Sequence, residues 1–152
     1  MTDALTLDLF AKQQNPWYAR MSNHATAQTV SAPGTLTYDT ADYDPLGRCG
    51  LLGGTGANYN APVNGLYLCG VTFGVTTDLD LSLALYLSGT QISHGTEITG
   101  SATHYTTGTV IDLVPMNAGQ YIQGGIAYIS ASGSAVLGEY DNYLWVVLLR
   151  EF

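Results

Sequence analysis

Hydrophobic and polar residues alternate in short stretches along most of the chain, a pattern that predicts strands. From Ser31 onward these stretches are separated by Gly, Asn, Asp and Ser at intervals of about 8–12 residues. No helix longer than a turn or two is expected in that region. Many short strands joined by turn-forming residues indicate an antiparallel all-β protein, built as a sandwich or a barrel.

Several segments have the composition of strands. Residues 67–75 form a largely apolar run, which we expect to be a strand buried on both faces. Residues 81–87 (LSLALYL) alternate and end at Ser88-Gly89-Thr90, a hairpin turn signal. The other expected strands are residues 35–39, 109–114, 120–130 and 143–149, and a further turn is expected over residues 115–119.

Residues 58–73, NYNAPVNGLYLCGVTF, place polar turn-forming residues directly before the most apolar strand. Pro62 has no backbone N–H to donate to a sheet, so it belongs at the start of a strand or at an edge. Asn64 and Gly65 tolerate positive φ, and we expect them to turn the chain sharply. The turn then leads residues 66–73 into the middle of the sandwich.

The charge of the chain excludes several classes of partner. With 152 residues the chain fits one domain that can bury a sizeable core. Its formal net charge is −8, and its cations are Lys12, Arg20, Arg48 and Arg150. These scattered cations provide no surface for a phosphate backbone, so nucleic-acid binding is not expected. Anionic membranes would repel the protein, and no apolar run is long enough to span a bilayer.

The N-terminal segment and the cysteines bear on the compartment. Residues 1–14 carry Asp3 and Asp8 where a secretion signal would carry cations, so we expect synthesis in a cytoplasm. Cys49 and Cys69 have no metal-like spacing. In a reducing compartment both are most simply interpreted as small buried hydrophobic residues, with a disulfide as the alternative.

Several segments resemble one known family. NAPVNGLYLCGVTF, residues 60–73, resembles the part of C1q/TNF-like jelly-roll domains in which an Ala-Pro-x-x-Gly-x-Tyr pattern leads into a central strand. Four more segments resemble parts of this family in the same order, with Gln120 where an Asp is common. They are SAPGTLTYDTADYDPLGR, LALYLSGTQI, TVIDLVPMNAGQYIQGGIAY and DNYLWVVLL.

The resemblance implies a jelly-roll sandwich over residues 31–152 that closes into a homotrimer about a threefold axis. The 11 tyrosines and the low content of charged residues suit a subunit that buries aromatic side chains against copies of itself. Residues 1–30 would then form a short N-terminal arm. The aromatic residues expected in the core or at the threefold interface are Tyr67, Phe73, Tyr121, Tyr128, Tyr143 and Trp145.

A trimeric jelly roll with a short arm and no secretion signal resembles the virion proteins of bacteriophages. The first hypothesis is a capsid decoration protein on the virion surface, whose arms bind the major capsid protein or another virion protein. Three arms on one trimer would bind with avidity. The residues expected to anchor the arm are Leu5, Leu7, Leu9, Phe10, Trp17 and Tyr18.

An alternative hypothesis is a receptor-binding module at a tail tip or tail fibre, which recognises a host surface glycan or protein. The candidate loops are residues 50–60, 93–107 and 131–142. They are rich in Gly, Ser, Thr and Tyr, a composition that suits adaptable recognition but also simple solvated loops. The sequence does not decide between the capsid and the tail.

Two groups of acidic residues are candidates for a metal site, and the sequence does not decide whether either binds a metal. Asp39, Asp42 and Asp44 share one expected loop, and Asp78 and Asp80 share another. Calcium binds to oxygen clusters of this kind, but Asp is also a common turn residue and the spacing is not that of an EF-hand.

No catalytic motif is present. His24, His94 and His104 are isolated in the sequence, and no Ser or Cys lies in the context of a nucleophile. Glu97, Glu139 and Asp141 could supply the two carboxylates of a glycosidase, but no further feature marks such a pair. We therefore expect no enzymatic activity and no cofactor.

Overall fold

A computed structural model describes residues 17–24, 28–51, 57–75, 78–101, 106–131, 133–134 and 142–152. The anchoring residues expected at Leu5, Leu7, Leu9 and Phe10 lie outside the described residues. Within the described part, the secondary structure consists of antiparallel strands, and no helix is long and apolar enough to cross a membrane. The prediction of an antiparallel all-β protein is confirmed.

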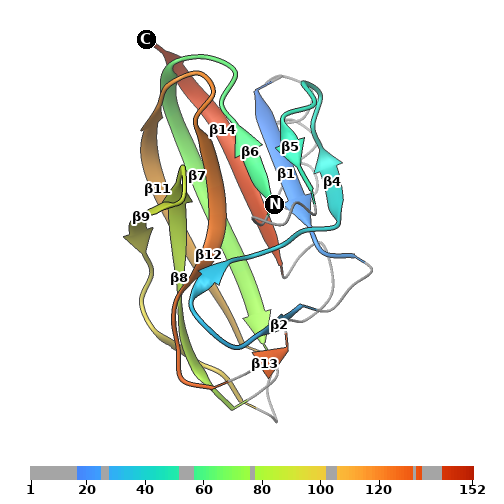
Figure 1. Ribbon diagram of the computed structural model, residues 1–152, viewed down its shortest axis with the longest axis vertical. Coiled ribbons are helices and arrows are strands. Elements are labelled where there is room, and N and C mark those ends of the chain that lie inside the picture. Colours follow the sequence, from blue (N-terminus) through green and yellow to red (C-terminus); the bar gives the residue numbers. More distant parts are fainter. Residues whose placement is uncertain are drawn as a thin grey trace, which may run out of the picture.

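Two sheets form the domain, and their long strands run along its long axis (Figure 1). The five-stranded sheet has the order β11-β7-β14-β1-β4, and the path of the seven-stranded sheet is β10-β8-β12-β6-β5, with β3 beside β12 and β9 beside β8. The first sheet contains β1 (Tyr18–Ser22), β4 (Thr40–Tyr43), β7 (Gly65–Val75), β11 (Thr106–Met116) and β14 (Tyr143–Glu151). The second contains β3 (Gly34–Thr35), β5 (Cys49–Gly50), β6 (Asn58–Asn60), β8 (Asp80–Leu87), β9 (Thr90–His94), β10 (Ile98–Thr99) and β12 (Tyr121–Ile129). A separate pair joins β2 (Thr29–Val30) to β13 (Gly133–Ser134).

Strand β7 lies between β11 and β14 and supplies much of the core. Because side chains alternate along a strand, the odd-numbered residues from Tyr67 to Val75 point toward the seven-stranded sheet, and they are buried. On the opposite face Leu66 and Leu68 are only half-buried. The predicted strand is confirmed, but the expectation that both of its faces are fully covered is wrong for its first half.

Gly65 begins β7 without the positive φ that the sequence suggested, since Gly65 is not among the glycines with positive φ. A side chain there would collide with neighbouring strands, because an added Cβ would lie 2.5 Å from Leu148 Cδ1 and 2.6 Å from the carbonyl oxygen of Arg150. Asn64, directly before β7, contacts the turn between β11 and β12. Its Oδ1 accepts a hydrogen bond from the Ala118 N–H at 2.8 Å. The close approach of β14, and not a sharp bend, requires glycine at position 65.

The hairpin between β8 and β9 has the predicted turn. Ser88 and Gly89 have φ values of 49° and 82°, which fit a two-residue turn of the mirror-image type. The turn expected over residues 115–119 begins later, because β11 continues through Pro115 to Met116. Pro115 is tolerated because β11 is an edge strand. Of the strand expected over residues 35–39, only Thr35 belongs to a strand, which is β3.

The N-terminal part of the chain differs from the prediction of an arm that extends to residue 30. Residues 18–22 form β1, which pairs with β14 on one side and with β4 on the other. The alternation of the segment explains this position, because Ala19 and Met21 point into the core. Tyr18 is 8% exposed and Trp17 packs against the core, so neither is the free anchor that we expected.

Both cysteines are free thiols. Cys69 lies in the core and Cys49 is half-buried, and burial raises the pKa of each thiol above its ordinary value. The interpretation of Cys69 as a small buried hydrophobic residue is confirmed.

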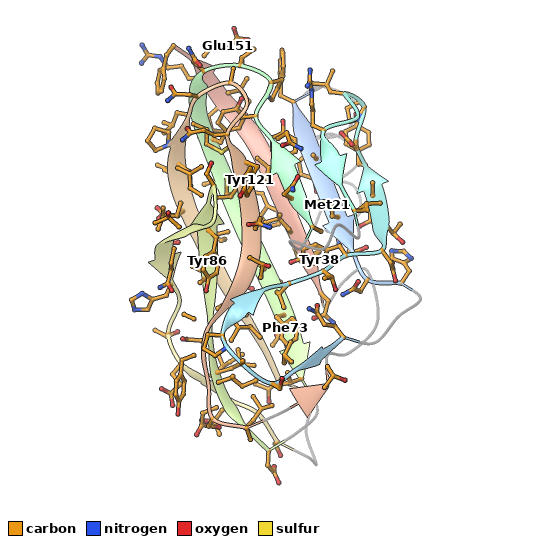
Figure 2. All side chains as sticks on the ribbon, viewed as in Figure 1. Met21, Tyr38, Phe73, Tyr86, Tyr121 and Glu151 are labelled. Carbon is orange, nitrogen blue, oxygen red and sulfur yellow. The ribbon has the colours of Figure 1, made fainter. Side chains whose placement is uncertain are left out.

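Phe73 lies near the lower end of β7 in Figure 2 and is 1% exposed. Replacement of Phe73 with Ala should lower the free energy of unfolding by about 3–5 kcal/mol, because it removes buried surface and leaves a cavity. Denaturant titration followed by circular dichroism measures the change. Phe152→Ala is the control, since Phe152 is 72% exposed and its loss should cost less than about 0.5 kcal/mol. Similar effects of the two substitutions would contradict the core position of Phe73.

Candidate self-association surface

The outward face of the five-stranded sheet is apolar over strands β11 and β7. In the register of this pair, Ile111 lies opposite Gly70, Leu113 opposite Leu68 and Pro115 opposite Leu66. Residues directly opposite each other share a face of the sheet. Ile111 and Leu113 are 55% and 52% exposed. An edge strand thus presents large apolar side chains to solvent on the side away from the core.

Strand β14 continues the same face. Tyr143 lies opposite Thr72, Trp145 opposite Gly70 and Val147 opposite Leu68, and the three β14 side chains are half-buried. We refer to the resulting surface as the sheet face. It comprises Leu66, Leu68, Ile111, Leu113, Pro115, Tyr143, Trp145 and Val147.

Trp145 packs directly on the backbone of β7. An added Cβ at Gly70 would lie 2.5 Å from Trp145 Cε2 and 2.6 Å from the indole Nε1. The absence of a side chain at Gly70 therefore lets the indole lie close to the sheet, where its edge continues the apolar surface. This is the reason that the strand pattern carries a glycine in its most apolar stretch.

Charged groups border the sheet face on the side of β1 and β4. Arg20 lies opposite Trp145, and its guanidinium carbon is 4.4 Å from the centroid of the Tyr143 ring. The Arg20 Nε is 3.6 Å from Asp42 Oδ2, and Asp42 Oδ1 is 2.9 Å from the His24 Nε2. An apolar centre with a charged border is the usual arrangement of a protein–protein interface.

The edge strand β11 carries two features that oppose uncontrolled strand addition. Asp112 lies opposite Cys69, which places a charged residue on the inward-facing side of the edge. Pro115 removes one backbone donor from the same strand. Inward-pointing charges and prolines are common protections of exposed sheet edges. Association through the flat side of the sheet is thus favoured over association through its edge.

The structure separates the aromatic residues that the sequence grouped together. Tyr67 and Phe73 are core residues, whereas Tyr143 and Trp145 belong to the sheet face. The other two, Tyr121 and Tyr128, lie in β12 of the opposite sheet, and Figure 2 shows Tyr121 there.

Sequence reasoning missed Ile111, Leu113 and Pro115. Residues 109–116 read TVIDLVPM, which has apolar residues at both odd and even positions. The alternation therefore did not indicate which side of the strand faces solvent. Only the pairing with β7 decides it.

Two of the acidic residues expected in loops belong to strands, because Asp42 lies in β4 and Asp80 begins β8. Asp44 Oδ1 and Oδ2 accept hydrogen bonds from the backbone N–H groups of Arg48 and Cys49 at 2.8 and 2.7 Å, as expected of an Asp in a turn. Asp39 Oδ1 accepts from the His24 N–H at 2.9 Å. Within the described ranges, no three His, Cys, Asp or Glu side chains come together as a possible metal site, and His104 lies outside these ranges.

Comparisons with known proteins identify the fold as the jelly roll of TNF and C1q domains. No family model and no curated protein matches the sequence. Among solved structures, Eiger TNF from S. frugiperda has a TM-score of 0.67 at 13% identity, with 89% of this chain and 93% of that chain covered. The globular domain of zebrafish complement 1qA has a TM-score of 0.66 at 9% identity, with 89% and 98% covered. Murine APRIL has a TM-score of 0.59 at 12% identity, with 87% and 98% covered.

Substitution of Gly70 by Ala tests the packing of Trp145. The new methyl group should displace the indole and lower the free energy of unfolding by about 1–3 kcal/mol, the usual cost of overpacking. Tryptophan fluorescence in a Trp17→Phe background reports the position of the indole, and denaturant titration reports stability.

A double-mutant cycle with Trp145→Ala provides the control. If the clash with the indole causes the loss, Gly70→Ala should cost much less when the indole is absent. An equal cost in both backgrounds would contradict the packing described above.

Proposed function

We propose that this protein is a non-enzymatic structural protein that assembles as a homotrimer through the sheet face. The observation that carries the proposal is the apolar side of the five-stranded sheet, where Ile111 and Leu113 are more than half exposed. A contiguous exposed apolar patch of this kind marks an interaction site. The fold supports the trimer, because TNF and C1q-type proteins form homotrimers.

Within this proposal, the trimer is a component of a bacteriophage virion surface, most specifically a capsid decoration protein. The support comes from the sequence: an acidic chain poor in lysine, and an N-terminal segment with Leu5, Leu7, Leu9 and Phe10. Because β1 begins at Tyr18, the attachment function falls to residues 1–16. Three such segments on one trimer would bind the major capsid protein or another virion protein with avidity.

A receptor-binding module at a tail tip or fibre is the second candidate function. One observation favours it: a pocket with an exposed tyrosine on the seven-stranded sheet, away from the sheet face. The number of copies per particle separates the two functions, since a shell needs many trimers and a tail tip needs few.

Leu113→Lys tests the trimer. A lysine among the exposed apolar residues of the sheet face would have to lose its hydration on association, so the variant should dissociate to a protomer. Light scattering after size-exclusion chromatography should give three times the protomer mass of 16.1 kDa for the native protein and the protomer mass for the variant. Ile92→Lys, at a 39% exposed position of the other sheet, is the control that should remain trimeric. A native protein of protomer or dimer mass would overturn the proposal.

Deletion of residues 1–16 tests attachment to the particle. The truncated protein keeps β1 and should remain a folded trimer, but it should no longer sediment with virus particles that lack the native protein. A variant with Leu5, Leu7, Leu9 and Phe10 replaced by Ser should behave in the same way, because it removes the apolar contacts and keeps the length of the chain. Normal co-sedimentation of either variant would contradict the role of this segment.

A further inference from the structure

The seven-stranded sheet carries a pocket of about 430 Å³ on its outward face. Ser82, Ala84 and Tyr86 are the residues of β8 that point away from the core, since Leu81, Leu83 and Leu85 point into it. The pocket therefore lies on the side of the domain opposite the sheet face. Its lining consists of Ser82, His94, Gly95, Thr96, Glu97 and Tyr128.

An irregularity in β12 places Tyr128 in this pocket. Ile126 pairs with Leu83 and Tyr128 pairs with Ser82, so the intervening Ala127 has no opposite residue on β8. In a regular strand Tyr128 would face the core like Ile126, because side chains alternate. The extra residue reverses the alternation and leaves Tyr128 47% exposed on the outward face.

A second irregularity lies on the other side of β8, at the same level. His94 pairs with Ala84 and Ile98 pairs with Leu81, so residues 95–97 are opposite only Ser82 and Leu83. These three residues outnumber the two opposite them by one, and Thr96 and Glu97 form the wall of the pocket beside Ser82. Bulges occur preferentially next to functional sites, where they redirect side chains. The bulge at Ala127 and the break between β9 and β10 lie on opposite sides of Ser82 and Leu83.

The wall of the pocket is held in place by the backbone. The Gly95 N–H donates to the Leu83 carbonyl oxygen at 2.8 Å, and the Gly100 N–H donates to that of Leu79 at 2.6 Å. Ile98 packs against Gly108 of β11, where an added Cβ would lie 2.7 Å from the Ile98 Cδ1. A wall fixed at both ends loses little conformational entropy when a ligand binds.

The chemistry of the lining suits a sugar. Tyr128 provides an exposed aromatic ring, and Ser82, Thr96, His94 and Glu97 provide hydrogen-bond donors and acceptors around it. The lining contains no Lys or Arg, and it contains the carboxylate of Glu97. An anionic ligand would therefore be repelled, whereas the hydroxyl groups of an uncharged ring could bind these groups. We propose that this pocket binds an uncharged sugar residue, with one face of the ring against Tyr128.

The sugar site is independent of the proposed trimer and of the virion role. It lies on the outward face of the seven-stranded sheet, so association through the five-stranded sheet would leave it open. Each trimer would present three sites, and binding to a glycan with repeated sugars would be strengthened by avidity.

Titration of the full-length protein with uncharged methyl glycosides tests the proposal. The probes are those of glucose, galactose, mannose, rhamnose and N-acetylglucosamine, followed by two-dimensional NMR of the labelled protein. At least one should shift the resonances of residues 94–97 and Tyr128, with a dissociation constant on the order of 1–10 mM for a single ring in an open pocket. Light scattering on the same sample reports the oligomeric state, which separates failure of the sugar site from failure of the trimer.

Two variants and one control complete the test. Tyr128→Ala should weaken binding at least about tenfold, and Glu97→Gln, which keeps the shape of the wall, should weaken it about threefold or more. Phe152→Ala removes an exposed aromatic residue elsewhere and should bind like the native protein.

Three results would overturn the proposal. They are the absence of binding by every probe at about 50 mM, unchanged binding by Tyr128→Ala, and tighter binding of an anionic sugar such as sialic acid than of the uncharged probes.

Discussion

The structure depends on strand β7, because one of its faces packs in the core and the other forms part of the sheet face. Pairing with β11 on one edge and β14 on the other leaves its backbone hydrogen bonds within the sheet. Its odd-numbered side chains then fill the core, and its even-numbered positions form part of the sheet face. The core residues explain why the sheet packs on its partner sheet. The even-numbered residues explain why the outer side of the same sheet is apolar and only partly covered by the chain itself.

Glycines that lie close to large aromatic side chains shape both outward faces. Gly70 accommodates Trp145 on the five-stranded sheet, and Gly125 accommodates Tyr86 on the other, where a Cβ would collide with the ring. The aromatic groups nevertheless have different surroundings. Trp145 lies among the apolar residues of the sheet face, with Arg20 opposite it on β1, whereas Tyr86 is in the same row as Ser82, on the sheet that carries the polar pocket. The two outward faces are therefore chemically distinct, and the domain can use one for association and the other for recognition.

This separation connects the two proposals. Association would remove the apolar sheet face from water. It would leave the pocket with Tyr128 directed away from the assembly. A capsid decoration protein with such pockets could add weak contacts with glycans to the particle surface, while a receptor-binding module would depend on them. The two proposed functions would use the same subunit and would differ in the virion protein that residues 1–16 bind.

The sequence by itself determined the class of fold and the long strands, because apolar runs, hairpin turns and the order of the segments are local properties. Strands β7, β8, β11, β12 and β14 and the turn at Ser88 and Gly89 were predicted, although β11 extends further than expected. The tertiary structure alone decided the position of β1 and the outward direction of Ile111, Leu113 and Tyr128. The reason is physical: residues 109–116 are apolar on both faces, and the unpaired Ala127 reverses the alternation that a sequence pattern assumes. Which side of a strand meets solvent depends on the register with its neighbours, which no single segment encodes.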